Sequence, residues 1–224
     1  MRRALVLHGK YQDGEKMRAF VRSASLRVAD LLRDAVFLPA PFVEMPKVAA
    51  AAASSKKKTR RRRTASPTTL DHPEQFRVWW RDGREREDFE TCKGFLRPYL
   101  EEADVIVGFS QGAALASLLM TRPVAEELSF NPKLAILCAG YPLQCEWSQA
   151  LLEQGICAAP PPRVVMLAGS TDRVVHADQS RELALLIGAD VLLHAGGHRF
   201  ARDNIIDERI TEEAIRLNIL DNKG

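Results

Sequence analysis

Three side chains in this sequence, Ser110, Asp172 and His198, have the types and the chain order that nucleophilic catalysis by a serine requires. A serine hydroxyl is a weak nucleophile at neutral pH, so it needs a base to take its proton. An imidazole serves as that base when a carboxylate fixes its tautomer and stabilises its charged form. The three residues therefore predict transfer of an acyl group through a covalent intermediate.

Ser110 stands at the centre of the pentapeptide 108–112, GFSQG, which fits the pattern G-x-S-x-G. Residues 105–107 before it are typical of a strand buried on both faces, and residues 113–120 after it favour a helix. No spare residue separates the two, so the turn must be abrupt, and its glycines let neighbouring backbones approach. This context predicts a nucleophile elbow, and the alternative is a serine in an ordinary glycine-rich turn.

Asp172 and His198 each follow a predicted strand. Asp172 lies in the loop after the strand 164–168, and His198 lies in the loop after the strand 191–193. In doubly wound sheets, sites form at the carboxyl ends of the strands, so we expect both side chains to converge on Ser110. The alternative for Asp172 is a helix cap.

Four other histidines compete with His198 for the role of the base. His8 follows the first strand and is expected to shape an oxyanion loop rather than to act as a base. His176 lies near a predicted helix start, where it either lines a pocket or caps the helix. We expect His194 to be structural and His72 to be solvated.

A tetrahedral intermediate also needs donors for its oxyanion. The backbone N–H of Gln111 is one candidate because it starts a helix, and the backbone N–H of Lys10, after the first strand, is the other. Because both act through the backbone, we expect little constraint on their side chains. The residues expected to line a substrate pocket are Tyr11, Tyr141, Trp147 and His176.

Strands and helices alternate along the whole chain. This alternation predicts an α/β fold: a doubly wound, mostly parallel sheet with helices on both faces, in a single domain over residues 1–224. We expect strands at 4–7, 36–38, 105–107, 134–138, 164–168 and 191–193, and helices at 15–33, 85–100, 113–120, 177–187 and 203–217.

The segment from about 47 to 70 does not fit this pattern. It carries eight of the 32 basic residues and no acidic one, so the remaining 24 face 29 acidic residues. We expect a disordered insertion of low complexity, whose run Lys56–Arg63 is a candidate nuclear import signal for an import receptor. The other readings of the run are a nucleic-acid arm and a solvated insertion under no constraint, and the acidic remainder of the chain makes nucleic acid an unlikely partner.

Composition excludes several classes of protein. No apolar run approaches the roughly 20 residues that span a membrane. The four cysteines show no C-x-x-C spacing, which favours reduced thiols in a cytoplasmic protein, and no metal-ligand cluster stands out. The stretch 143–162 is too short for a lid domain. It could form only a small cap that contacts an acyl chain through Trp147, Leu151, Leu152 and Ile156, and ordinary amphipathic packing is an equal alternative.

Six motifs together resemble the FSH family of serine hydrolases: Leu7–Gly9, Trp79–Trp80, the elbow, Cys138–Tyr141, Ser170–Val175 and Gly196–His198. The resemblance implies an α/β-hydrolase fold and hydrolysis of acyl esters, some of them long-chain, with Ser110, Asp172 and His198 as triad and with no metal or organic cofactor. The basic segment departs from the family pattern. An acyl-thioester or acyl-protein thioesterase, and a catalytically silent binding module, stay open as alternatives.

Overall fold

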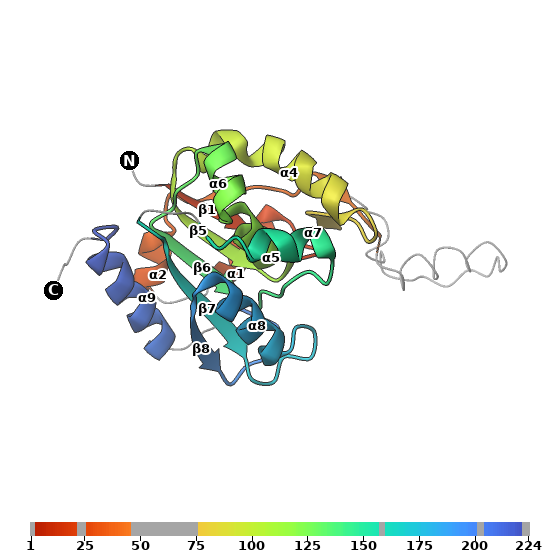
Figure 1. The fold of residues 1–224 in the computed structure, drawn as a ribbon. Helices are drawn as coiled ribbons and strands as arrows, with labels where there is room; N and C mark the ends of the chain where they lie inside the picture. Colours follow the sequence, from red (N-terminus) through yellow and green to blue (C-terminus); the bar gives the residue numbers. More distant parts are fainter. Residues whose placement is uncertain (1–2, 22–25, 46–75, 157–159, 201–203, 221–224) are drawn as a thin grey trace, which may run out of the picture.

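The computed structural model describes residues 3–21, 26–45, 76–156, 160–200 and 204–220. Its centre is a six-stranded sheet in the order β2-β1-β5-β6-β7-β8, and every neighbouring pair is parallel (Figure 1). The strands are β1 (Arg3–Leu7), β2 (Val36–Phe37), β5 (Ala103–Phe109), β6 (Leu134–Cys138), β7 (Arg163–Gly169) and β8 (Asp190–His194).

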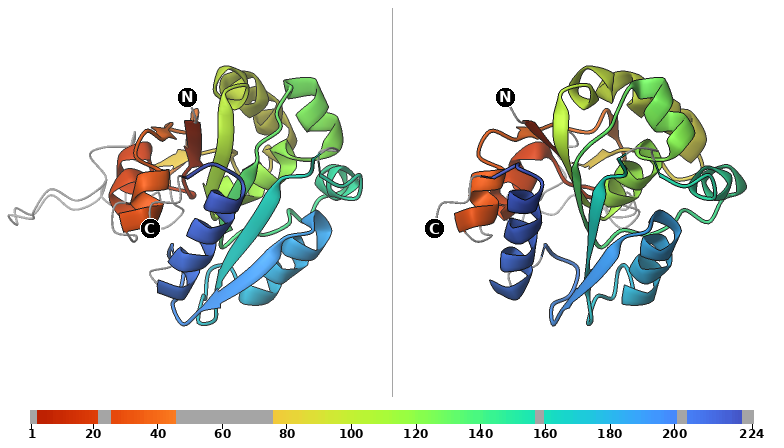
Figure 2. Two further views of the ribbon diagram at one scale, coloured as in Figure 1. Left: turned by 90° about the vertical axis from the view of Figure 1, so that its left-hand side faces the viewer. Right: turned by 60° about the vertical axis from the view of Figure 1, so that its left-hand side comes forward.

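Helices cover both faces of this sheet (Figure 2). On one face lie α1 (Gly14–Val21), α2 (Leu26–Leu31) and α9 (Asn204–Arg216). On the other lie α4 (Glu85–Leu100), α5 (Gln111–Leu119), α6 (Arg122–Leu128), α7 (Glu146–Leu152) and α8 (Ala177–Ile187). The predicted doubly wound α/β fold is therefore confirmed.

The core consists of two apolar clusters, one on each face of the sheet. Alternate side chains of a strand enter opposite clusters: Leu5 of β1 packs toward α4 and α5, whereas Val6 packs toward α1 and α9. The same alternation in β5 sends Ile106 to the first cluster and Val107 to the second. Burial on both faces explains why these strands read as continuous apolar runs in the sequence.

Some elements differ from the expectations. The helix expected at 15–33 corresponds to α1 and α2, between which residues 22–25 lie outside the described part, and a turn begins at residue 32. The sequence also missed α6, α7 and an antiparallel pair, β3 (Phe42–Val43) with β4 (Arg77–Val78).

The strands β3 and β4 lie on either side of the expected insertion. Their ladder is extended by a hydrogen bond of 3.0 Å from the Glu44 N–H to the Phe76 carbonyl. The insertion at 47–70, its basic run and His72 fall within residues 46–75, outside the described residues, so their disorder and role stay predictions.

No helix among the described residues is long and apolar enough to cross a membrane.

Candidate active site

Ser110 occupies the sharp turn between β5 and α5. Its backbone has φ 53° and ψ −115°, a region that residues other than glycine rarely adopt and that stores local strain. Hydrogen bonds hold the turn, because the Ser110 N–H donates to the Cys138 carbonyl at 2.8 Å and the Ser110 carbonyl accepts from two N–H groups of the first turn of α5. The predicted strand–turn–helix geometry is confirmed.

The glycines on either side of Ser110 are required by close backbone contacts. A Cβ on Gly108 would lie 2.5 Å from Cα of Ala113, and one on Gly112 would lie 2.3 Å from the carbonyl oxygen of Leu7. Neither neighbour is a flexible side chain that could move away. The elbow can therefore press against β1 only because both positions lack a side chain.

The structure brings the side chains of Ser110, His198 and Asp172 together at the carboxyl ends of the strands. The Ser110 Oγ lies 3.1 Å from Nε2 of His198, and Nδ1 of the same imidazole lies 2.8 Å from Oδ2 of Asp172. Both distances are those of hydrogen bonds. Asp172 and Ser110 are buried, while about a fifth of the His198 side chain (21%) is exposed.

The Asp172 carboxylate is held by its own loop. Its Oδ1 accepts the backbone N–H groups of Val174 at 2.8 Å and Val175 at 3.0 Å, which leaves Oδ2 directed at His198. The N-cap of α8 is His176, so Asp172 is not the helix cap that the sequence left open. Two backbone donors stabilise the charged form of a carboxylate, and this arrangement suits a partner for an imidazolium.

Two residues outside the triad hold the loop that carries His198. The Phe109 ring lies 4.8 Å from the imidazole, centroid to centroid, with the planes tilted by 44°. The Cys138 thiol donates to the Arg199 carbonyl at 3.3 Å, while the Cys138 carbonyl accepts from Ser110. Cys138 thus links the serine turn to the histidine loop, a contact that sequence reasoning missed.

The loop after β1 passes directly beside Ser110. A Cβ on Gly9 would lie 3.3 Å from the Ser110 Cβ and 2.8 Å from the Phe109 ring. Within the described part of the chain, neither the Lys10 N–H nor the Gln111 N–H donates to a protein acceptor. The Gln111 N–H also lies in the first turn of α5, where the helix dipole favours a negative charge.

The expectation that the side chains of Lys10 and Gln111 are little constrained is wrong. The Lys10 ammonium forms ion pairs with Asp82 and, at 2.9 Å, with Glu44. Burial opposes its charge, but the hydrogen bonds to these two carboxylates outweigh burial and raise the pKa of Lys10. The buried Gln111 amide bonds to the backbone of Trp79 and Trp80. Sequence spacing could not show these contacts because all the partners are distant along the chain.

The other described histidines have different surroundings. His8 is fully buried, and burial lowers its pKa to about 4. His194 is buried at the end of β8, where its Nδ1 accepts the Gly196 N–H at 3.1 Å. His176 is exposed at the N-cap of α8, and its N–H donates to the Gln179 side chain at 3.0 Å.

The four expected pocket residues lie in four different places, two of them in loops. Tyr11, at φ 62°, follows Lys10 in the loop beside Ser110, and the Lys10 ammonium lies 5.1 Å from its ring. Tyr141 packs against both apolar clusters, and burial raises the pKa of its hydroxyl to about 12. Their roles in binding a substrate, like that of His176, stay predictions.

The expected cap is the short helix α7, which packs on α5 in the helical layer. The Trp147 ring lies 5.3 Å from that of Phe89 in α4, centroid to centroid, and Leu152 is buried. Leu151 and Ile156 pack partly against the same cluster. Amphipathic packing accounts for all four residues, and their contact with an acyl chain stays a prediction.

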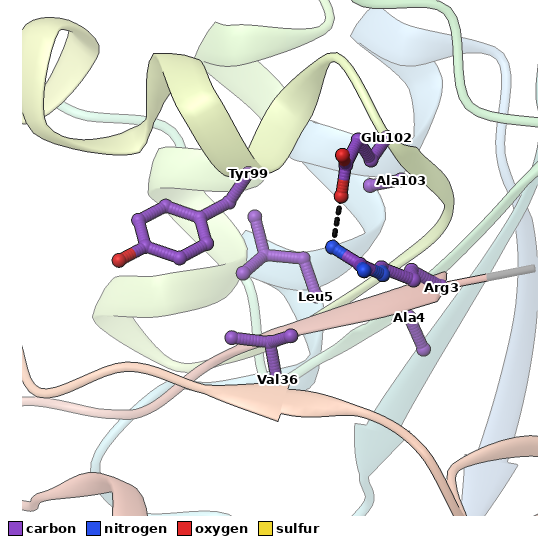
Figure 3. Close-up of a pocket in the computed structure, with 7 residues that line it drawn as sticks. All are labelled: Arg3, Ala4, Leu5, Val36, Tyr99, Glu102 and Ala103. Atoms are coloured by element: carbon purple, nitrogen blue, oxygen red, sulfur yellow. Dashed lines mark hydrogen bonds and ion pairs between the residues drawn. The ribbon is translucent and has the colours of Figure 1, made fainter.

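A small pocket lies at the opposite edge of the sheet, where β1 and β5 begin (Figure 3). Its volume of about 10 Å³ is no more than the space that one water molecule needs. It is therefore too small for an acyl chain. Seven residues line it: Arg3, Ala4, Leu5, Val36, Tyr99, Glu102 and Ala103.

Comparisons with known proteins agree with this geometry. Residues 1–207 match the family described as serine hydrolase (FSH1). The chain is 32% identical to esterase OVCA2 of Danio rerio over 217 residues, which is 88% of either protein. It is 29% identical to esterase CG5412 of Drosophila melanogaster over 214 residues, 88% of this chain and 68% of that protein.

Solved structures share the fold. Arabidopsis thaliana SOBER1 superposes with a TM-score of 0.60 at 16% identity, over 97% of this chain and 99% of that chain. Acyl-protein thioesterase 2 of Zea mays superposes with a TM-score of 0.61 at 15% identity, over 95% and 94%. The fold is that of the α/β hydrolases, and the chain belongs to the FSH1 family of serine hydrolases, which supports hydrolysis of esters.

Proposed function

We propose that this protein is a serine carboxylesterase that cleaves acyl esters through an acyl-enzyme intermediate, with Ser110 as nucleophile, His198 as base and Asp172 as its partner. The observation that carries the proposal is the His198 imidazole, which lies within hydrogen-bond distance of both Ser110 and Asp172. A catalytically silent binding module has no use for that arrangement.

In the first half of the reaction, the Ser110 Oγ attacks the carbonyl carbon of the ester and its proton passes to Nε2 of His198. The carbonyl oxygen becomes an oxyanion, which accepts hydrogen bonds from the backbone N–H groups of Lys10 and Gln111. The bond to the alcohol then breaks, and His198 returns the proton to the leaving oxygen. The products are a free alcohol and an acyl group esterified to Ser110.

In the second half, His198 takes a proton from a water molecule, whose oxygen attacks the acyl carbon. The oxyanion forms again at the same donors and collapses, which releases the carboxylic acid and returns the proton to Ser110. The Asp172 carboxylate holds the Nδ1–H tautomer throughout and stabilises the imidazolium. Besides the ester and one water molecule, these steps use only Ser110, His198, Asp172 and the two backbone donors.

We expect the preferred esters to carry medium-to-long aliphatic acyl chains, bound beside α7 and Tyr141. Each methylene removed from water contributes about 0.8 kcal/mol, so kcat/KM should rise with chain length until the chain extends beyond the surface that can cover it. An acyl thioester offers the same carbonyl to the same residues, so thioester hydrolysis stays the runner-up.

The test is hydrolysis of p-nitrophenyl esters from acetate to palmitate by wild type and by Ser110→Ala, with labelling by a fluorophosphonate probe. Ser110→Ala should abolish turnover and labelling at an unchanged melting temperature. The matched control is Ser117→Ala, which removes the hydroxyl of another buried serine of the same region, one that donates to the Ala114 carbonyl of α5. Labelling that persists in Ser110→Ala would refute the nucleophile, and a steady fall in kcat/KM beyond acetate would refute the chain preference.

We also propose that the protein works in the cytoplasm and that the run Lys56–Arg63 lets an import receptor carry it to the nucleus. The run has the composition of an import signal. Replacing its basic residues by glutamine should leave esterase activity unchanged and should remove nuclear fluorescence of a tagged protein. An unchanged distribution would contradict the signal.

A further inference from the structure

Two separate segments supply the two backbone donors that the proposed function assigns to the oxyanion. One donor, the Gln111 N–H, belongs to the elbow, and the other, the Lys10 N–H, belongs to the loop after β1. We propose that the Gln111 side chain and Trp79 form a buried strut, two hydrogen-bonded side chains that fix the position of one donor relative to the other. Gln111 and Trp79 are therefore positioning residues for the oxyanion hole. This inference rests on the proposed function.

The first part of the strut is the Gln111 side chain, which forms hydrogen bonds to the backbone of Trp79 and Trp80. Its Oε1 accepts the Trp79 N–H at 2.8 Å, and its Nε2 donates to the Trp80 carbonyl at 2.9 Å. The side chain is buried, so no water competes for either bond. Gln111 therefore offers one donor through its backbone and holds Trp79 through its side chain.

The second part is the Trp79 indole, which reaches the loop after β1. Its Nε1–H donates to the His8 carbonyl at 2.8 Å, and its ring lies 5.2 Å from the His8 imidazole. The His8 carbonyl also faces the elbow, because a Cβ on Gly112 would lie 2.6 Å from it. This carbonyl is thus fixed between the indole and the start of α5.

The His8 ring then sets the direction of the second donor. Its Nε2 accepts the Ala40 N–H at 2.9 Å, so the neutral ring carries its proton on Nδ1 and donates it to the Gly9 carbonyl at 2.8 Å. The Gly9 carbonyl also accepts the Gln12 N–H at 3.2 Å. A trans peptide unit directs its C=O and its N–H to opposite sides. The Lys10 N–H of this unit therefore points away from both of these partners.

These contacts form one connected path between the two donors. It runs from the Gln111 backbone through its own side chain to Trp79, then to the His8 carbonyl, and through the His8 ring to the peptide that bears the Lys10 N–H. Oxyanion donors act only when they are aimed at the charge that forms in the transition state. A break in the path should therefore weaken the transition state far more than the ground state.

The test compares Trp79→Phe, which keeps an aromatic ring but lacks the indole N–H, with Gln111→Met, which keeps the length of the side chain but loses both bonds. The control is Thr121→Val, at the N-cap of α6 just after α5, which loses another buried hydrogen bond, to the Leu118 carbonyl. For each variant we would measure the melting temperature, and kcat and KM with a p-nitrophenyl ester. We would also measure the inhibition constant of an alkyl trifluoromethyl ketone, whose carbonyl oxygen becomes an oxyanion when the serine adds to the carbonyl carbon.

We expect kcat to fall about tenfold or more in both strut variants, with KM within about threefold of wild type, since loss of a whole donor costs about 10²–10³-fold. Affinity for the ketone should fall by the same factor as kcat/KM. Thr121→Val should change the melting temperature alone.

Ketone affinity within twofold of wild type in both strut variants would overturn the inference. Losses of kcat and ketone affinity in Thr121→Val as large as those in the strut variants, at a similar fall in melting temperature, would overturn it too. Either result, with Ser110→Ala inactive, leaves the proposed function standing. Turnover by Ser110→Ala would instead refute the proposed function itself.

Discussion

His198 differs from the other three histidines that the structure describes in having both ring nitrogens bonded to side chains, those of Asp172 and Ser110. His8 and His194 are buried and bond to backbone groups, and His176 caps a helix at the surface. Geometry at the level of single residues therefore favours one candidate for the base, and chain order had favoured the same one.

Alanine variants of His198, His176 and His194 separate the candidates. His198→Ala should lower kcat by several orders of magnitude, because no other described group lies within reach of the Ser110 hydroxyl to take its proton. His176→Ala and His194→Ala should retain activity within about tenfold. Steady-state kinetics with a p-nitrophenyl ester show which histidine is the base. An inactive His176→Ala variant, with a nearly normal His198→Ala variant, would reverse the assignment.

His8 predicts a pH dependence of stability. Its pKa is about 4 in the folded protein against an ordinary value of 6.5, so between these values the unfolded chain binds a proton that the folded protein does not. Stability should therefore fall as the pH drops from 6.5 to 4, by about 3 kcal/mol from this group, with no further loss below pH 4.

Urea unfolding of wild type and His8→Gln between pH 7 and pH 4 measures this contribution, because glutamine does not titrate. The free-energy gap between the two proteins should shrink by about 3 kcal/mol over that range. A gap that stays constant would show that His8 is not held neutral.

Residue types and their order were enough to predict that the side chains of Ser110, Asp172 and His198 converge. The loops that follow parallel strands all lie at the carboxyl edge of the sheet. Residue types and their order were not enough to predict what Gln111, Trp79 and Cys138 do. Each of these acts through a backbone group far away in the chain, and such a partner leaves no periodic signal in the sequence. The pair of tryptophans was the visible hint, without an indication of its role.

Among the elements, long helices and buried strands were predicted well because each carries its own apolar pattern. The helix α4 has the predicted bounds, Glu85–Leu100, and so does α8. The strands β3 and β4 have two residues each, too few for any alternation, and α6 and α7 have seven each. Short elements depend on their packing partners, which the sequence does not identify.

Alanine should have opposite effects at two glycines, Gly112 of the elbow and Gly94 of α4. Gly112→Ala should destabilise the protein by several kcal/mol or prevent folding, because its Cβ would meet a backbone carbonyl at 2.3 Å. Gly94→Ala, inside the exposed face of α4 with nothing near its Cβ, should stabilise by about 0.5–1 kcal/mol. Thermal unfolding measures both, and a harmless Gly112→Ala would contradict the close contact.

For the whole molecule, the antiparallel pair of β3 and β4 defines where the insertion can be removed. Deleting residues 48–69 keeps both strands and the bond between Glu44 and Phe76. Turnover of a small soluble ester should therefore stay within a few-fold of wild type, because a segment of this composition contributes nothing to the core. Deletion that abolishes folding, seen by circular dichroism, would show that the segment is structural.

The register of β1 with β5, in which Leu7 lies opposite Gly108, also has a kinetic consequence. Roughly 100 residues must form a closed loop before these central strands can meet, and pairings so distant in sequence make folding slow. The entropy of closing a loop changes only with the logarithm of its length, so shortening this one by 22 residues alters it by about 0.2 kcal/mol. The protein should consequently refold slowly from denaturant, at a rate that depends little on how much chain separates the two strands.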